Sequence, residues 1–394
     1  MIALLTLALA QAPAPAPGPD PILAGLEQAR SWLLAHQEED GAWGHWRNPG
    51  PYDDAWSNLE THRSWQAAVT GLAVIALADS AEAGPDPPRE ACRRAWTRGL
   101  RFLCRRLPEL RRPSDWDTDV VWAWAYGLAA LTRSARHPWL DHPDARDLRS
   151  EVETVGRFLL ERLAAYQTPL GGWAYYADET LARRPYWTTS FVTAVVVLGL
   201  LDARELGWPV EEDRLARAVA CLEHCRLPNG AYAYSDGPLP AVDGALDIDQ
   251  VRGSLSRIQV GNLALWRAGR AGIGAGLPRE ELVRGLRLFL AEHRFLDLAY
   301  QRPIPHEAWY FNSGYFYFFG HFYAAGVVEA LGPEARAEFG PKVARHLLKV
   351  QEADGSMFDF AMNSFGRPYG VAFALSALAR LRPRPRVLAV PLLY

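Results

Sequence analysis

The sequence predicts an all-α protein that folds as an α6/α6 toroid, a closed ring of six helical hairpins with an inner and an outer layer. Three observations lead to this prediction. A two-helix unit recurs along most of the 394-residue chain, the second helix of each unit is apolar on all sides, and 49% apolar with 22% charged side chains is the composition of a folded protein. The same composition excludes a chain that is disordered as a whole.

Residues 1–20 precede the repeated units and differ from them in character. An apolar run opens the segment, small residues stand at Ala8 and Ala10, and a Pro/Ala tract follows. This pattern predicts a secretory signal peptide and a linker, so we expect export to the periplasm or the cell exterior. The run is short and no basic residue precedes it, which leaves a cytoplasmic location open. No later segment reaches the apolar length that a membrane span requires.

A turn that occurs twice in nearly the same form reveals the repeat. Residues 37–44 (QEEDGAWG) closely match residues 351–358 (QEADGSMF), and the first copy belongs to a frame W-L-x3-Q-x3-G-x-W that begins at Trp32. Degraded copies of the frame occur at Phe102-Leu103, Gln167, Cys221-Leu222, Phe289-Leu290 and His346-Leu347. The unit is therefore roughly 60 residues long, and it occurs six times.

Each unit contains two helices of different character. The first is amphipathic, as in 22–36 and 278–293, with arginine and glutamate on one face. A turn ends it, in which glycine supplies left-handed backbone, the Gln amide bonds loose backbone groups and an aromatic side chain covers the turn. The second helix is apolar all round, so protein must surround it. Its copies are 65–78, 120–131, 190–201, 258–266, 316–331 and 371–381.

These properties place the second helices in an inner ring and the amphipathic helices in an outer ring. An open solenoid is the alternative, but it would need polar capping units and a less uniformly buried second helix. Residues 21–382 are predicted to form one domain, and residues 383–394 an extended tail. All inner helices run parallel, so their N-termini meet at one mouth of the ring.

Long loops lead into this mouth, and long irregular loops on one face usually carry binding or catalysis. They span about 44–62, 108–118, 174–187, 233–253, 301–312 and 358–367. We therefore expect the functional site at the mouth.

The charge balance and the cysteines exclude some partners. Formal net charge is −3, so no excess of positive charge argues for nucleic acid. Contact with a membrane surface and the oligomeric state are left open. Cys92, Cys104, Cys221 and Cys225 lack the spacing of a structural zinc site. Cys221, His224 and Cys225 share a helix face without a fourth ligand, so we interpret them as packing residues. The sequence thus predicts no metal and no cofactor.

The repeated frame resembles the QW repeat of squalene and oxidosqualene cyclases. The layout of the whole mature chain resembles the prenyltransferase/squalene-oxidase repeat superfamily, which includes squalene-hopene cyclase-like proteins, terpenoid cyclases and protein prenyltransferases. This resemblance implies a central cavity lined by aromatic and small side chains, fitted in several relatives to an isoprenoid chain. It is specific for the toroid and much less specific for chemistry.

An acidic motif at the start of an inner helix is the first candidate for chemistry. Class II cyclases of this family protonate an alkene through the middle Asp of DxDD, and the nearest match is DTDV at 117–120. The missing last acid matters, because a neighbouring carboxylate raises the pKa of a carboxyl group, whereas a helix N-terminus lowers it. Asp119 and Asp117 are the candidate catalytic residues, with a helix N-cap as the alternative. A weaker match, DIDQ, stands at 247–250.

Aromatic and polar residues near inner-helix starts are candidates for ligand contact. Aromatic rings stabilise a carbocation through their faces, although they more often form plain core. Several arginines at one mouth would favour an anionic ligand such as a diphosphate, a carboxylate or a sugar acid. The candidate substrate-binding residues are Trp122, Trp124, Trp187, Tyr315, Phe319, His321, His62, Arg63, Arg257, Arg367 and Tyr369. Of these, His321 is interpreted as a hydrogen-bonded inner histidine rather than a base.

Three functional hypotheses follow. The first is an exported toroid that binds an apolar, isoprenoid ligand and cyclises or isomerises it, with Asp119 as the acid and Trp122 and Trp124 as cation-stabilising rings. The second is a non-catalytic binding or scaffold toroid, and the third is a polysaccharide lyase or hydrolase. A closed apolar chamber that reaches Asp119 would favour the first, a filled centre the second and an open polar groove the third. The zinc motif of prenyltransferases and the thioester motif Cys-Gly-Glu-Gln are absent from the sequence.

Overall fold

The structure is a computed structural model, and it describes residues 20–45, 59–84, 88–110, 119–175, 187–236, 247–360 and 365–382. The outer helices are α1 (Pro21–Ala35), α3 (Arg89–Arg106), α5 (Leu148–Tyr166), α7 (Glu212–His224), α9 (Arg279–Ala291) and α12 (Pro333–Lys349). The inner helices are α2 (Leu59–Ser80), α4 (Val120–Ala135), α6 (Ser190–Glu205), α8 (Leu255–Arg270), α11 (Phe316–Leu331) and α13 (Gly366–Leu381). Smaller elements are α10 (Arg294–Ala299), strands β1 (Thr188–Thr189) and β2 (Ser235–Asp236), and the 3-10 helices Leu107–Glu109, Pro138–Asp141, Asp247–Asp249, Val251–Gly253 and Trp309–Phe311.

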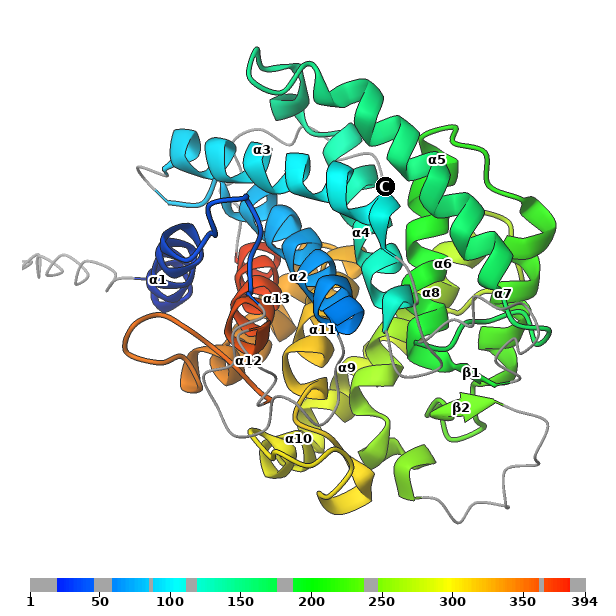
Figure 1. Ribbon diagram of the computed structural model, residues 1–394. Coiled ribbons are helices and arrows are strands. Elements are labelled where there is room, and N and C mark those ends of the chain that lie inside the picture. The colour runs from blue at the N-terminus through cyan, green and yellow to red at the C-terminus, as the bar shows by residue number, and fades with distance from the viewer. Residues whose placement is uncertain are drawn as a thin grey trace, which may run out of the picture.

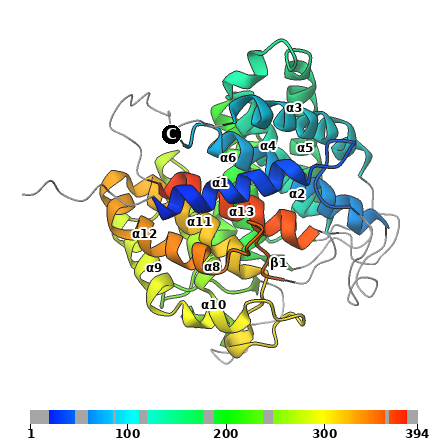
Figure 2. The ribbon, with the colours of Figure 1, turned by 90° about the vertical axis from the view of Figure 1, so that its left-hand side faces the viewer.

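The inner helices form a closed ring. In the order α2, α4, α6, α8, α11 and α13, each packs against the next, and α13 packs back against α2. The outer helices surround this ring (Figure 1). Figure 2 shows α1 lying across α13 and α2, where the first and last hairpins meet. The predicted all-α toroid is therefore confirmed, and the open solenoid is wrong.

Burial separates the two layers as the hydrophobic patterns predict. Every side chain from 190 to 201 in α6 and from 316 to 328 in α11 is buried, because these helices face protein on all sides. The outer helix α7 buries only one stripe. The inner helix α2 begins at Leu59, six residues before the predicted 65–78, because its first turns carry polar residues that an apolar pattern does not capture.

The turn that follows the outer helix has the same backbone in four hairpins. After α1, the N–H of Glu38 donates to the carbonyl of Ala42, and the N–H of Gly41 donates to the carbonyl of Glu38. Equivalent pairs of hydrogen bonds close the turns at 168–172, 227–231 and 352–356. The glycines Gly41, Gly171, Gly230 and Gly355 have φ between 86° and 96°, a left-handed conformation that favours glycine.

In three of these turns a glutamine joins neighbouring hairpins. The Nε2 groups of Gln37, Gln167 and Gln351 each donate to the glycine carbonyl of their own turn. Each also donates to a carbonyl of the next outer helix, at 2.8, 2.8 and 2.9 Å. The second acceptor of Gln351 is Gly25 in α1, so this bond joins the last outer helix to the first. The amide therefore bonds the carbonyl of its own turn, as the sequence predicts, and also a helix carbonyl of the next hairpin.

The fifth hairpin departs from this plan. Its predicted turn over 289–300 contains no glycine, and the chain forms α10 there instead of a turn. Arg294 and Asp297, predicted to occupy the turn, therefore lie in α10. Without a glycine, no residue of this segment adopts the left-handed conformation easily.

Loops that enter the inner helices meet at the mouth of the ring. Strand β1, directly before α6, pairs antiparallel with β2 in the loop that leads to α8. The 3-10 helices Asp247–Asp249 and Val251–Gly253 pack against Trp309–Phe311, before α11. The predicted signal and linker, apart from Asp20, and the predicted tail at 383–394 lie outside the described residues. In the part of the chain that is described, no helix combines the length and hydrophobicity needed to cross a membrane.

A candidate ligand site at the mouth of the ring

Aromatic side chains from four inner helices meet in the middle of the ring. Trp122 of α4 stacks on Tyr126 at 5.6 Å and contacts Phe191 of α6 at 5.8 Å between ring centroids. Phe319 of α11 contacts Trp122 at 6.3 Å and Phe373 of α13 at 6.2 Å. We call these five residues the aromatic floor. Helices α4 and α11 stand on opposite sides of the ring, so side chains fill the ring at this level.

Five more aromatic side chains lie between the floor and the mouth, and all are half-buried. They are Tyr175, Trp187, Tyr234, Tyr315 and Tyr369, which we call the aromatic rim. Tyr175 contacts Trp187 at 5.2 Å, and both Tyr175 and Tyr234 reach the floor at Phe191. Floor rings other than Trp122 are at most 5% exposed. The rim therefore presents part of its ring surface above a buried aromatic layer.

A buried arginine lies beside the rim. The guanidinium of Arg257 is 1% exposed, and its central carbon lies 5.4 Å from the ring centroid of Tyr234 and 5.7 Å from that of Phe316. Its Nε donates to the carbonyl of Tyr232 at 3.2 Å and its Nη2 to the carbonyl of Ile248. Its Nη1 has no hydrogen-bond partner. Burial lowers the pKa of Arg257 to about 10, so the group stays cationic at neutral pH.

A histidine and a tyrosine extend the polar part of the site. The Nδ1 of His306 lies 2.7 Å from the carbonyl oxygen of Phe311. A carbonyl only accepts, so Nδ1 carries the proton, and Nε2 accepts from the hydroxyl of Tyr315 at 3.0 Å. Burial, and the charge of Arg257, lower the pKa of His306 below its ordinary value, which keeps the ring neutral. We call Arg257, His306 and Tyr315 the polar corner.

The predicted acid Asp119 stands at the N-cap position directly before α4, but its side chain does not cap the helix. Its φ is 41°, a strained value for this residue type, and its side chain makes no capping hydrogen bond. Instead, Oδ2 accepts from Nε1 of Trp65 in α2 at 2.9 Å. The structure thus departs from the N-cap alternative, because the carboxylate turns toward the neighbouring inner helix. Asp117 lies outside the described residues.

A second carboxyl group, Asp359, is fully buried near the rim. Its Oδ2 accepts from the N–H of Phe318 in the first turn of α11 at 2.9 Å, while its Oδ1 has no hydrogen-bond partner. Burial raises the pKa of Asp359 to about 8, so the group is largely protonated at neutral pH. Its carboxyl group is close enough to the rim residue Tyr369 to help raise the pKa of that phenol.

The remaining candidates from the sequence are dispersed. Trp124 is buried against Tyr166 of the outer helix α5, away from the floor. Arg63 pairs with Glu60 at 2.5 Å. The ring of His62 lies 5.7 Å from that of Phe365, and the guanidinium of Arg367 lies over the ring of Phe358 at 4.8 Å. His321 is buried behind the floor, with its Nδ1 2.8 Å from the carbonyl oxygen of Tyr317. Trp122, Trp187, Tyr315, Phe319, Tyr369 and Arg257 are the predicted residues that the structure brings together.

Among the residues that the structure describes, two groups of side chains have donor atoms close enough to share a metal ion. One is Cys221, Cys225 and Asp236, where strand β2 brings a carboxylate to the two thiols of α7. Sequence reasoning did not find this carboxylate, because only the fold places residue 236 next to the helix. The other group is His293, Asp297 and His346, from α10 with its N-cap and from α12.

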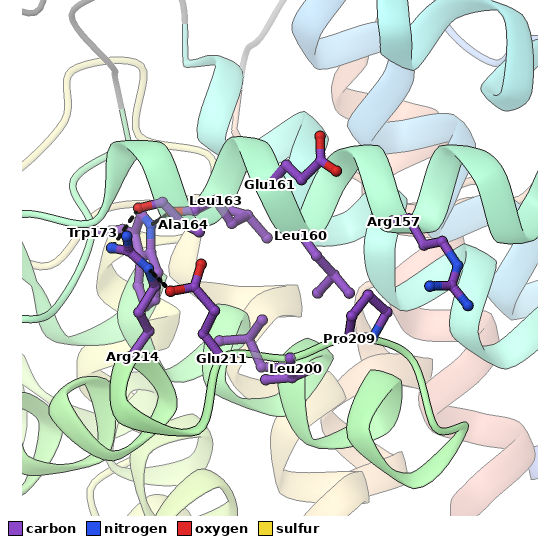
Figure 3. A pocket seen from close by; sticks show the side chains of 11 residues that line it. Arg157, Leu160, Glu161, Leu163, Ala164, Trp173, Leu200, Pro209, Glu211 and Arg214 are labelled. Atoms are coloured by element: carbon purple, nitrogen blue, oxygen red, sulfur yellow. Dashed lines mark hydrogen bonds and ion pairs between the residues drawn. The ribbon is translucent and has the colours of Figure 1, made fainter.

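A small cavity lies away from the mouth, between α5 and α7. Its volume is about 60 Å³, and Figure 3 shows Leu160, Pro209 and Leu200 around it, with Arg214 bonded to the carbonyl of Ala164 and to Glu211. Such a volume holds a water molecule or two but no isoprenoid chain. The aromatic rim and the polar corner therefore remain the candidate site, because they combine partly exposed ring surface with an unpaired polar atom, Nη1 of Arg257.

Comparison with solved structures places this architecture among enzymes of two kinds. An inactive variant of the alpha-1,6-mannanase GH76A of Salegentibacter sp. HEL1_6, in complex with alpha-1,6-mannotetrose, superposes with a TM-score of 0.59 at 12% identity, over 91% of this chain and 98% of that one. The type II terpene cyclase MstE from Scytonema, in complex with geranylgeranyl dihydroxybenzoate, superposes with a TM-score of 0.51 at 13% identity, over 92% and 98%. A family 76 glycoside hydrolase from Bacteroides thetaiotaomicron gives 0.52 at 11% identity, over 91% and 97%.

These likenesses define the class of protein. The chain is an α/α-toroid protein, with the ring architecture found in type II terpene cyclases and in family 76 glycoside hydrolases. At such identities the likeness shows the fold alone. No protein-family model matches this chain, and no curated protein matches its sequence.

Sequence reasoning missed Asp359, His306 and the group around His293. The spacing of His293 and Asp297, four residues apart and followed by a distant histidine, is visible in the sequence and could have indicated a ligand set. No sequence signal marks Asp359, because its burial and its bond to α11 are created by contacts between two hairpins.

Proposed function

We propose that this toroid binds an apolar, isoprenoid-like ligand with an anionic end at the mouth of the ring. The observation that supports this most directly is the buried guanidinium of Arg257, whose Nη1 is unpaired beside the rings of Tyr234 and Phe316. Nη2 of the same guanidinium lies 3.8 Å from Oδ1 of Asp249, but Nη1 has no acceptor, and an anionic group of a ligand would supply one. The half-buried rings of the rim would contact the hydrocarbon part.

The aromatic floor limits where such a ligand lies. Its rings touch across the centre, and a filled centre at this level favours a binding toroid over a chamber that encloses the whole ligand. The hydrocarbon would therefore rest above the floor instead of passing through the ring. Trp122, the one half-buried member of the floor, would present its ring to the ligand. An aromatic face attracts a cation by about 0.5–2 kcal/mol, which suits a carbocation formed at this place.

The proposed chemistry is acid-initiated isomerisation or cyclisation, with Asp359 as the acid in place of Asp119. Asp359 supports this role because burial keeps its carboxyl group protonated and leaves Oδ1 without a partner. Asp119 instead accepts a hydrogen bond from Nε1 of Trp65 in α2. A proton donor needs a proton at working pH, which Asp359 holds.

The test of this proposal is proton transfer in heavy water. The full chain is incubated in D2O with squalene, and separately with prenyl diphosphates, and products are analysed by mass spectrometry. We expect a product that carries deuterium on carbon, lost in Asp359→Asn and kept in Asp354→Asn, a matched change at an exposed aspartate of the neighbouring turn. Unchanged substrates, together with no prenyl lipid co-purifying with the protein, would remove the proposal.

A second variant tests the anionic end of the ligand. Arg257→Met removes the charge while keeping an apolar stem of similar length. We expect binding of prenyl diphosphates, followed by quenching of tryptophan fluorescence, to weaken at least tenfold, and binding of squalene to change little. Equal loss for both ligands would indicate damage to the fold instead of loss of an anion contact.

A second candidate function is hydrolysis of a glycan chain. The observation that favours it is Asp53-Asp54, the sole pair of adjacent aspartates in the sequence, shortly before the inner helix α2. Both lie outside the described residues. The inactive mannanase variant carries replacements of two adjacent aspartates. Release of reducing sugar from an α-1,6-mannan by the unmodified chain, abolished in a D53N/D54N variant, would favour this function over the first. No release would exclude it for this glycan.

We further propose that the protein is exported, on the basis of its apolar N-terminus and Pro/Ala tract. N-terminal sequencing of the protein from its native cells checks this. An N-terminus downstream of Ala8 agrees with cleavage, and an intact Met1 in the cytosolic fraction does not.

A further inference from the structure

Four side chains form a polar cluster behind the aromatic floor, outside the ligand site described above. His293 is the N-cap of α10, Asp297 lies one turn further in α10, His321 is in α11 and His346 is near the end of α12. Donor atoms of His293, Asp297 and His346 all lie within 4.8 Å of one another. The cluster therefore joins the fifth hairpin to the sixth.

The hydrogen bonds of His321 fix the proton on His293. Nδ1 of His321 lies 2.8 Å from the carbonyl oxygen of Tyr317, so this nitrogen carries a hydrogen. His321 is fully buried and therefore neutral, which leaves its Nε2 as an acceptor. Nε2 of His293 lies 3.1 Å from that acceptor, so it must be the donor. A neutral His293 consequently has a bare lone pair on Nδ1.

A carboxylate lies beside this lone pair. Nδ1 of His293 lies 3.3 Å from Oδ2 of Asp297, and it makes no hydrogen bond although the residue is only 3% exposed. Two electron-rich atoms at this distance repel each other unless a positive charge lies between them. The positive charge is either a second proton on His293 or a metal cation.

We propose that His293 Nδ1, the Asp297 carboxylate and His346 bind a divalent transition-metal ion, with Zn²⁺ as the best match. Two imidazoles and one carboxylate form a ligand set that zinc accepts, and three protein ligands leave a fourth position for water or another small ligand. A proton alone would satisfy His293 and Asp297 but would give no role to the third donor, His346, which comes from a different hairpin.

The neighbours of His293 support this role. Metal-binding histidines usually donate their second ring N–H to a fixed acceptor, which sets the tautomer and the ring orientation. His321 provides that acceptor, and the carbonyl of Tyr317 fixes His321 in turn. His321 is thus a positioning residue and not a ligand.

His346 changes orientation when the ion binds. Its ring stacks on that of His293 with centroids 3.4 Å apart and planes inclined by 22°, so the lone pairs of the two rings do not yet converge. His346 is half-buried, with part of its ring facing solvent. Rotation about its side-chain bonds brings a ring nitrogen edge-on toward the ion, as coordination requires.

Zinc stoichiometry of the full chain tests the proposal. The protein is dialysed against a chelator, then against Zn²⁺ at pH 7.5, and bound metal is measured by elemental analysis. We expect one equivalent in the unmodified chain and at least a tenfold weaker site in Asp297→Asn and in His346→Gln. The other metal-capable group supplies the control: a C221S/C225S variant should keep the equivalent of zinc.

Thermal unfolding separates metal loss from fold loss. Zinc should raise Tm in the unmodified chain and in C221S/C225S, and should leave Tm of Asp297→Asn unchanged while that variant still unfolds cooperatively. No bound zinc would overturn the proposal in favour of a protonated His293 paired with Asp297. Zinc that disappears with the cysteines, or persists in both Asp297→Asn and His346→Gln, would overturn it as well.

Discussion

The third and fifth hairpins make the same connection between outer and inner helix in different ways. In the third, a glycine turn at 168–172 and Gln167 attach the connection to the next outer helix. In the fifth, α10 and a longer loop replace the turn, and no glutamine is present at the equivalent position, which is Arg294. Among the described residues, the repeated turn thus occurs in four hairpins and is replaced in the fifth.

What replaces the turn in the fifth hairpin is a strained and apolar loop. Gln301, His306, Tyr310 and Phe311 all have positive φ, between 51° and 63°, and Trp309 is 72% exposed. Strain of this kind persists only where surrounding contacts impose it, and it gathers at functional sites. The polar corner and the proposed metal site both draw residues from this hairpin, so the divergence from the repeat coincides with the two proposed sites.

The largest expected loss of stability comes from breaking the repeated turn. Gly171→Val would place a Cβ 2.6 Å from the carbonyl oxygen of Arg217 at a φ of 95°, so we expect a loss of about 3 kcal/mol of unfolding free energy. Gly207→Ala is the control, because its φ is also positive but nothing lies within 4 Å of the added Cβ. It should cost about 1 kcal/mol. If urea denaturation gives the same loss of unfolding free energy for both variants, the positive φ alone is responsible and the contact with Arg217 is not.

Loss of the glutamine side chain should lower the unfolding free energy by a smaller amount, and only in hairpins whose turn contains this glutamine. Gln167→Leu removes three hydrogen bonds, two donated by Nε2 to the carbonyls of Gly171 and Arg214 and one accepted by Oε1 from Arg217, so we expect a loss of about 2 kcal/mol. Arg294→Leu at the equivalent place of the fifth hairpin changes a side chain that is 68% exposed. It should alter stability by about 0.5 kcal/mol or less. Similar losses in both variants would contradict the difference between the hairpins.

Asp359 connects the sixth hairpin to the fifth and should make stability depend on pH. Burial raises its pKa to about 8 in the folded state, above the value near 3.9 of an unfolded chain. Its contribution is therefore fully present below about pH 4 and is lost as pH rises toward about 8. Asn can accept the same bond from Phe318 and does not ionise, so the stability of Asp359→Asn relative to the parent should rise by up to about 4 kcal/mol between pH 5 and pH 8. Parallel profiles in urea denaturation from pH 5 to 8 would contradict this.

The exposed aromatic residue of the divergent loop should have the smallest effect on stability. Trp309→Ser removes a side chain that is 72% exposed, so the unfolding free energy should change by about 0.5 kcal/mol or less. Retention of the folded protein on a hydrophobic matrix should fall at the same time, because exposed apolar area decreases. A clear loss of stability would show instead that the indole holds the strained loop in place.

The fold could be predicted because its signals are local and repeated. The apolar pattern of 190–201 and the turn at 37–44 each report on their own neighbourhood, and six weak copies together define a ring. The start of α2 was less predictable. Its first turns contain polar residues such as His62, so the apolar pattern predicts a helix that begins only at residue 65.

The site was predicted only in part, since it depends on how hairpins meet. Trp122 and Trp124 look alike in the sequence, but two residues along a helix point to nearly opposite sides, so only Trp122 joins the floor. Asp119 was visible as a motif, whereas the protonated carboxyl group of Asp359 depends on tertiary burial. The roles of both acids remain predictions.

The bond from Gln351 to Gly25 has a consequence for how the chain can be cut. Asp20 and Arg382, at the two ends of the ring, form an ion pair at 3.3 Å. Because the first and last hairpins contact each other as neighbours in the ring, residue 382 can be linked to residue 20 and the chain opened between two other hairpins. We expect this circular permutant to fold into the same toroid.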